Sequence, residues 1–339
     1  MKLYGAIDLH SNNSVLVLLD EQDRVVYERR LPNDLSVVLT ELAPYRESVQ
    51  AIAVESTYNW YWLVDGLMEA GYMLKLVNTA AVKTYDGLKY AGDEHDARHL
   101  AHLVRLGILP TGYIYPKEDR AVRDLLRKRA QLVRCRTAQI LSIQNLVSRN
   151  CGKGISVEAI RALDDTAITR LCGGNGARSL AIQSNLTVMR CLDAQIEGLE
   201  RVVLAQAKLK PAFKKILTID GIWNILGMTI MYEMGTPERF AKVGQFASYA
   251  RCVSSSRWSN GKKKGEGNRK NGNKYLAWAF VEAAHFAVRY NERIRRFFQR
   301  KKAKTNGIVA IKAVAHKLAR ACYHVLKEQT PFQVERAFA

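Results

Sequence analysis

The chain has 339 residues, of which 48% are hydrophobic and 25% charged, so its size and composition suit a soluble globular protein with two or three domains. It contains no apolar run near the roughly 18 residues that cross a membrane. Six scattered cysteines without a Cys-x-x-Cys pair argue against a zinc cluster or a disulfide framework and favour a reducing cytoplasm.

The net charge of +20 is unevenly distributed along the chain. Residues 1–110 carry 10 Lys and Arg against 15 Asp and Glu, residues 111–230 carry 19 against 10, and residues 231–339 carry 23 against 7. An acidic front joined to a basic rear indicates a polyanionic partner, with a metal-dependent domain coupled to one that grips phosphate. A basic protein without any nucleic-acid role is the alternative.

The first 80 residues alternate strand and helix signals. The expected elements are strands at 2–9, 14–19 and 24–30, a helix at 35–42, a strand at 49–54, a helix at 59–70 and a strand at 72–77. Three hairpin-like strands followed by alternating helix and strand predict an α/β domain. Ribonuclease-H-like folds have this order, although spacing alone does not prove such a fold.

From residue 117 the pattern becomes helical. Two long stretches, 117–150 and 177–208, carry apolar residues at seven-residue intervals, namely Leu126, Val133, Ile140 and Val147, and then Ile182, Met189, Ile196 and Val203. This spacing predicts an antiparallel or intersubunit coiled coil, and two core helices of one bundle fit it equally well.

The last third begins with a compact apolar segment at 216–234. A loop rich in Ser, Gly and Lys is expected at 253–273, followed by helices at 274–290 and 308–328. The predicted organisation is therefore an α/β domain at 1–115, a long-helix region at 116–210 and an all-α domain at 211–339.

Two acidic residues close apolar strands in the predicted α/β domain. Asp8 follows the strand that ends at Ile7, and Glu55 follows the apolar run at 51–54. Because adjacent strand ends in an α/β sheet commonly form the functional site, these carboxylates are candidates to meet there.

Asp93 and Asp96 fall on the apolar stripe of a predicted helix, together with Leu100, Leu103 and Val104, at about 100° per residue. Burying two like charges in a core is costly unless a cation or a distant arginine compensates them. Four carboxylates suit Mg²⁺ or Mn²⁺ rather than zinc, and two such ions can clamp the attacking and leaving oxygens of a phosphodiester. Asp8, Glu55, Asp93 and Asp96 are therefore predicted to be catalytic metal ligands for nuclease or strand-transfer chemistry.

The acids lie in the motifs AIDLHSN, AVEST and GDEHDARHLAHL, and the block RFAKVGQFASYARCVSSSRWSNGKKKGEGNRKNGNKYLAWAFVEAA follows near the C-terminus. Over nearly its whole length the chain thereby resembles the DEDD transposases of the IS110 insertion-sequence family and their relatives, the pilin-gene invertases. The resemblance implies a RuvC-like, ribonuclease-H-fold domain, a coiled coil that supports dimers or tetramers, and a helical transposase domain. It also implies DNA recombination at the nucleoid, guided in many members by a structured noncoding RNA.

Members of this family use a serine of the C-terminal block as a nucleophile that becomes linked to DNA as a phosphoserine. Counting back eleven residues from Lys270 assigns this role to Ser259, with Ser254, Ser255 and Ser256 as alternatives. A hydroxyl needs a base or a metal to activate it, and since no histidine lies near in sequence, the acidic domain would supply that activation.

Basic residues of the same stretch are expected to hold backbone phosphates, namely Lys262, Lys263, Lys264, Arg269, Lys270 and Lys274. A solvated, disordered loop is the simpler interpretation of this stretch. Besides a recombinase, two functions stay open: a junction resolvase or nuclease that uses the same acids without the serine, and a nucleic-acid binder with a decayed site. A sugar-kinase-like interpretation lacks a glycine-rich phosphate loop at the required place.

Overall fold

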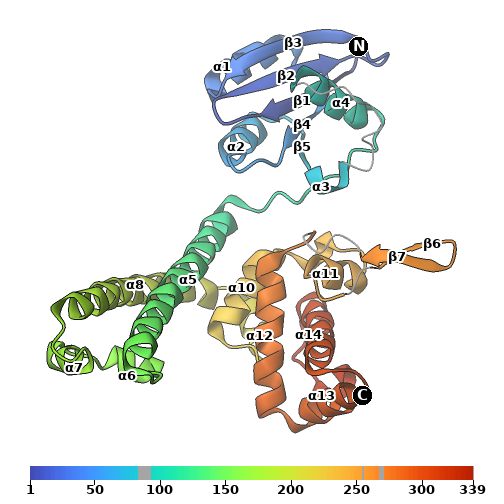
Figure 1. The fold of residues 1–339 in the computed structure, drawn as a ribbon. Coiled ribbons are helices and arrows are strands. Elements are labelled where there is room, and N and C mark those ends of the chain that lie inside the picture. The colour runs from blue at the N-terminus through green and yellow to red at the C-terminus, as the bar shows by residue number, and fades with distance from the viewer. Residues whose placement is uncertain (83–92, 254–255, 267–270, 339) are drawn as a thin grey trace. The chain divides into compact units, whose positions relative to one another are not determined.

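The computed structural model describes residues 1–82, 93–253, 256–266 and 271–338 (Figure 1). Within these ranges the side chains of Asp93, Glu94, Arg257, Trp258 and Glu266 lie outside the description. The chain forms two compact units, Met1–Lys117 and Glu118–Ala339. The long-helix region and the all-α domain of the predicted organisation both lie in the second unit. None of the described helices is long and apolar enough to cross a membrane.

The first unit is built on a mixed five-stranded sheet. Its strands are β1 (Leu3–Leu9), β2 (Asn13–Leu19), β3 (Val25–Pro32), β4 (Val49–Glu55) and β5 (Leu74–Val77), in the spatial order β3-β2-β1-β4-β5. The first three strands form an antiparallel meander, and β4 and β5 run parallel to β1. β1, β2 and β4 are the central strands because their residues are apolar on both faces. The predicted α/β class of this domain is confirmed.

Helices cover both faces of this sheet. Large side chains on one face, such as Ile7, Leu18 and Ile52, pack against α1 (Leu35–Leu42) and α2 (Tyr61–Glu69). The other face is lined by smaller residues and packs against α4 (Asp93–Arg105). The short elements η1 (Ala43–Tyr45) and α3 (Thr79–Val82) complete the unit.

Two long helices of the second unit, α5 (Lys117–Cys151) and α8 (Gly176–Lys208), lie antiparallel to each other (Figure 1). Arg129 binds Glu200 and Arg136 binds Asp193, so positions rise along one helix as they fall along the other. Seven of the eight predicted heptad positions are buried, and Val133 is half-buried. The stripes therefore pair two helices of one chain, with α6 (Val157–Arg161) and α7 (Asp165–Leu171) between them.

The rest of the second unit is a helical core. Its elements are α9 (Pro211–Ile216), α10 (Asn224–Met234), η3 (Pro237–Arg239), α11 (Val243–Tyr249), α12 (Lys274–Tyr290), α13 (Glu292–Lys304), α14 (Gly307–Glu328) and α15 (Val334–Ala337). All residues of α10 from Leu226 onward are buried, because this helix lies at the centre of the core. Alanines such as Ala283 and Ala315 allow α12 and α14 to pack closely.

A hairpin of β6 (Ser256–Ser259) and β7 (Lys262–Glu266) extends from the core between α11 and α12 (Figure 1). The prediction of a loop over 253–273 is therefore wrong for this part. Asn260 and Gly261 form its turn with φ of 49° and 68°, as a type I′ turn requires. An Asn-Gly pair between strand-forming residues is the signal that could have revealed the hairpin.

Candidate functional site

Asp8 and Glu55 lie side by side at the carboxyl ends of two parallel strands. In the register of β1 and β4, Ile7 pairs with Val54, so the next residue on each strand is an acid. Strand alternation directs both acids to the face that α4 covers. Asp8 is 4% exposed and Glu55 is half-buried. The structure thus brings these two predicted ligands together.

The carboxyl group of Glu55 lies close enough to that of Asp8 to change its own protonation. Burial raises the pKa of Glu55 to about 7, and the hydrogen bond with Asp8 and the negative charges of Asp8 and Asp96 act in the same direction. Ionising all three groups without a compensating cation is therefore costly. A bound cation would reverse that cost.

Asp96 stands at the edge of the same site. α4 packs against the sheet through Ala97, Leu100, Ala101 and other apolar residues, but the side chain of Asp96 is exposed. The prediction that Asp96 faces the core is wrong. Buried Leu100 and Leu103 lie on either side of it around the helix, but Asp96 stands in the first turn of α4, ahead of the first buried residue, Ala97. The charge of Asp96 still raises the pKa of Glu55, so the two carboxylates lie within electrostatic range.

The fourth predicted ligand, Asp93, is the first residue of α4, three positions before Asp96. Its side chain lies outside the described residues. Among the side chains that are described, no three His, Cys, Asp or Glu residues form a group that could hold a metal ion by themselves.

The donors of this site are nevertheless all carboxylate oxygens, which Mg²⁺ and Mn²⁺ prefer. Asp8 is buried and the pKa of its neighbour Glu55 is raised, so a cation bound between these carboxylates would favour their ionised forms. By donor type and electrostatics, the residues present fit a hard divalent cation.

His10 is a site residue that the sequence reasoning placed only in a polar turn. Its Nε2 lies 3.2 Å from Oδ2 of Asp8. Nδ2 of Asn33 and Nδ2 of Asn59 each donate a hydrogen bond to the carbonyl oxygen of His10 at 3.0 Å. The segments that follow β1, β3 and β4 therefore converge on the position of Asp8. The spacing Asp-x-His at a strand end is the signal that could have marked it.

Ser259 belongs to the second unit, where it ends β6 beside the hairpin turn. It pairs with Lys262 across the hairpin, and its side chain is exposed. A hydroxyl at this position is accessible to an extended substrate. Ser256, at the other end of β6, is also exposed, whereas Ser254 and Ser255 lie outside the described residues.

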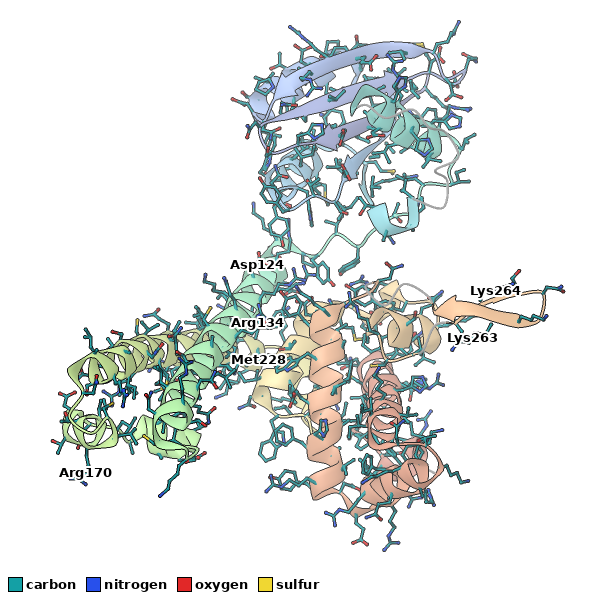
Figure 2. All side chains as sticks on the ribbon, in the orientation of Figure 1. Asp124, Arg134, Arg170, Met228, Lys263 and Lys264 are labelled. Atoms are coloured by element: carbon teal, nitrogen blue, oxygen red, sulfur yellow. The ribbon has the colours of Figure 1, made fainter. Side chains whose placement is uncertain are left out.

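Three of the predicted phosphate-binding residues, Lys262, Lys263 and Lys264, follow Ser259 on β7 and are all exposed. Figure 2 shows Lys263 and Lys264 on this hairpin. Lys274 is exposed at the first position of α12, and Arg269 and Lys270 lie outside the described residues. The hairpin therefore places a hydroxyl and three cations on one short, accessible element.

Two family models match this chain. A model of the IS110 DEDD transposases, described as "Transposase", covers residues 6–151, and the model "Transposase IS116/IS110/IS902 family" covers residues 214–299. The chain belongs to the IS110 family of transposases. The first model spans Asp8, Glu55, Asp93 and Asp96, and the second spans the hairpin with Ser259, so both candidate parts of the site lie in segments that identify the family.

Two curated transposases resemble this IS110-family transposase over most of their length. The "Probable family 20 transposase" of Pseudomonas aeruginosa is 23% identical, with 83% of this chain and 85% of that protein covered. The "Transposase for insertion sequence element IS1111A" of Coxiella burnetii is 22% identical, with 86% and 79% covered. The similarity therefore extends over both units.

Proposed function

We propose that this IS110-family transposase cuts and exchanges DNA strands with Ser259 as nucleophile and with Asp8, Glu55, Asp93 and Asp96 as ligands of Mg²⁺ or Mn²⁺. The meeting of Asp8 and Glu55 at one sheet edge, within range of the charge of Asp96, carries the proposal. The order β3-β2-β1-β4-β5, an antiparallel meander joined to two parallel strands, supports a RuvC-like, ribonuclease-H-fold domain.

When bound, a divalent cation supplies polarisation of phosphate oxygens and stabilises the charge that develops during strand cleavage. The protein contributes the shape of the site. Asp8 is fixed by burial and by His10, Glu55 is fixed beside it by the strand register, and the exposed Asp96 leaves one side open to a substrate. The loops that hold His10 keep Asp8 from turning toward solvent.

Ser259 would attack a backbone phosphorus of DNA. A bond forms between its Oγ and phosphorus, the bond from phosphorus to the leaving deoxyribose oxygen breaks, the hydroxyl proton passes to a base, and the leaving oxygen takes up a proton. Attack by the hydroxyl of another strand reverses these steps and releases the serine. Because one phosphoester replaces another, strand exchange needs no external source of energy.

Exposed lysines beside Ser259 would hold the phosphates on either side of the attacked bond. Phosphate contacts fix the register of a protein on DNA without reading sequence. These contacts therefore do not select the target sequence, and we propose that a noncoding guide RNA selects it. The large positive charge of residues 111–339 supports binding of a second nucleic acid besides DNA.

The long helices α5 and α8 are the proposed site of assembly into dimers or tetramers. Their heptad stripes are used within the chain, but Leu141, Leu180, Val188 and Val202 are exposed on the outside of this pair. Apolar residues on the outer surface of a helix pair are typical of a surface that meets another helix pair. We place the assembled protein in the cytoplasm, on nucleoid DNA.

Substitution of the serine separates this function from a junction resolvase. Ser259→Ala is expected to abolish both the covalent protein–DNA adduct and strand exchange, while Ser256→Ala, on the same strand, retains both. The substrate is DNA that spans the gene and its flanks, incubated with Mg²⁺ and analysed on denaturing gels. If Ser259→Ala cuts DNA as fast as the unmodified protein, the chain is a hydrolytic nuclease that uses the same acids.

Sequencing of nucleic acid that copurifies with the protein tests the guide. A discrete RNA encoded beside the gene is the expected result. Random fragments alone would contradict the guide.

A further inference from the structure

Glu233 is a carboxylate buried in the core of the second unit, with 1% of its surface exposed. It accepts hydrogen bonds from Nε of Arg123 at 2.9 Å and from Nε of Arg127 at 2.6 Å. Nη2 of Arg127 donates a further bond at 2.9 Å, and Nδ2 of Asn273 donates a fourth at 2.7 Å. Burial acts to raise the pKa of Glu233, but the two arginines and Asn273 outweigh it and hold that pKa below its ordinary value. The carboxylate is therefore ionised and fully paired.

The three donors come from elements far apart in the sequence. Arg123 and Arg127 lie in the first turns of α5, and Asn273 is the N-cap of α12. Oδ1 of Asn273 accepts from the amides of Tyr275 and Leu276 at 2.9 and 3.1 Å. One side chain thus caps α12 through its oxygen and binds Glu233 through its nitrogen.

Asn273 also closes the base of the segment that carries Ser259. Its amide donates to the carbonyl oxygen of Tyr249, the last residue of α11, at 2.6 Å. The side chain of Arg251 donates to the carbonyl oxygen of Gly272 at 2.9 Å. Gly272 has a φ of 89°, and a Cβ there would lie 2.5 Å from the same Tyr249 oxygen. The β6–β7 hairpin therefore extends from a closed base that rests on Glu233.

A buried ion network is a poor means of stabilising a core, because apolar side chains of similar volume often serve as well or better. The advantage of such a network is that hydrogen bonds are directional, so each bond fixes the position of its donor group. In this core the donors lie in the first three turns of α5 and at the base of the hairpin that carries Ser259.

We propose that Glu233 is a positioning residue for strand transfer, which fixes the hairpin base with Ser259 to the beginning of α5. This inference rests on the proposed role of Ser259. α5 begins at the junction of the two units, so the helix held by Glu233 is the one through which the acidic unit is covalently attached.

Asn273→Ser is the sharpest variant for a test. Serine is as good an N-cap as asparagine, so α12 keeps its cap, while the donor to Glu233 is lost. Glu233→Gln is the second variant, for the case in which the first does not fold. Glu200→Gln is the matched control, because its bond to Arg129 also joins α5 to another helix, away from the hairpin.

Two measurements on the full chain report the two steps of the inference. Hydrogen–deuterium exchange of the protein without DNA follows the amide of residue 273, and denaturing gels follow covalent attachment to DNA that spans the gene and its flanks. For Asn273→Ser we expect exchange at the hairpin base to be about tenfold faster. Adduct formation should be about 10- to 100-fold slower at unchanged DNA affinity. Glu200→Gln should match the unmodified protein in both.

Unchanged exchange at residue 273 would show that Glu233 does not close the base. Faster exchange with adduct formation at the normal rate would show that the base does not position Ser259. If the unmodified protein forms no adduct at all, the role of Ser259 is refuted, and the purpose assigned to Glu233 with it. The exchange data then report separately whether the closed base exists.

Discussion

Asp8→Asn should make the metal-free first unit more stable while removing its response to metal. In the unmodified protein Glu55 has a pKa of about 7 instead of its ordinary 4.5, because of burial, the hydrogen bond with Asp8 and the charges of Asp8 and Asp96. A group whose pKa is raised on folding stabilises the fold below its unfolded pKa and loses that contribution as pH rises through its folded pKa. Without metal, the unmodified protein should therefore lose stability between about pH 4.5 and 7.

The size of this loss follows from the pKa shift. At 1.36 kcal/mol per unit the shift would correspond to about 3 kcal/mol. Because Glu55 is only half-buried, solvent screening reduces this to about 1–2 kcal/mol. Asn at position 8 removes one neighbouring charge and one cause of the shift, so it should restore part of this free energy, on the order of 1 kcal/mol at pH 8. A variant that is more stable and less functional is what a strained site predicts.

Urea unfolding in EDTA and in Mn²⁺, at pH 5 and pH 8, measures both effects. In EDTA at pH 8 the variant should exceed the unmodified protein, and the difference should shrink at pH 5. With Mn²⁺ the unmodified protein should gain stability by mass action and the variant should gain little. The reasoning is refuted if Asp8→Asn is the less stable protein in EDTA at pH 8, or if Mn²⁺ stabilises both proteins equally.

Three further outcomes follow from the second unit. Changing the three lysines of β7 to Ala should make the fall of log DNA affinity with log salt concentration less steep, by about 2 to 3 units of slope, without changing thermal stability. An unchanged slope would mean that these lysines do not contact phosphate. Gly221→Ala should cost about 2–4 kcal/mol in urea unfolding, because φ is 84° and the new Cβ would lie 2.3 Å from the carbonyl oxygen of Ala283, whereas Gly173→Ala, with φ of 59° and open space, should cost about 1 kcal/mol. Since its partners lower the pKa of Glu233, its contribution is present at neutral pH and lost in acid, so acid unfolding followed by circular dichroism should be steeper for the unmodified protein than for Glu233→Gln.

The sheet and its strand-end acids were predictable because their signals are local. A run of apolar residues that ends on an acid, as at Ile7-Asp8 and Val54-Glu55, indicates both a strand and the position at which its buried part ends. The heptad stripes were equally local. The stripes did not show which helix each of them packs against. Pairing within the chain depends on the connection through α6 and α7, and no periodicity encodes that connection.

The exposure of Asp96 could not be predicted because its angular position on α4 is that of buried residues. The buried leucines of α4 lie on either side of Asp96 around the helix, but Asp96 is in the first turn, and the buried residues of α4 begin at Ala97 and include Ala101. These alanines fit a sheet face that is itself lined by small residues such as Ala6 and Ala53. Such a match of small to small exists only between two elements, so neither element reveals it alone.

Glu55 and Glu233 show what distinguishes a reactive acid from a structural one in this chain. Both follow apolar residues in the sequence, and burial acts to raise the pKa of both. Around Glu55 the neighbours that act on its pKa are acids, so they disfavour its charged form. Around Glu233 they are two arginines and an amide, donated by residues 40 to 110 positions away, so its charge is already satisfied. The sign of the pKa shift therefore distinguishes the proposed metal ligand from the carboxylate that is paired within the core, and no sequence window contains the residues that set either sign.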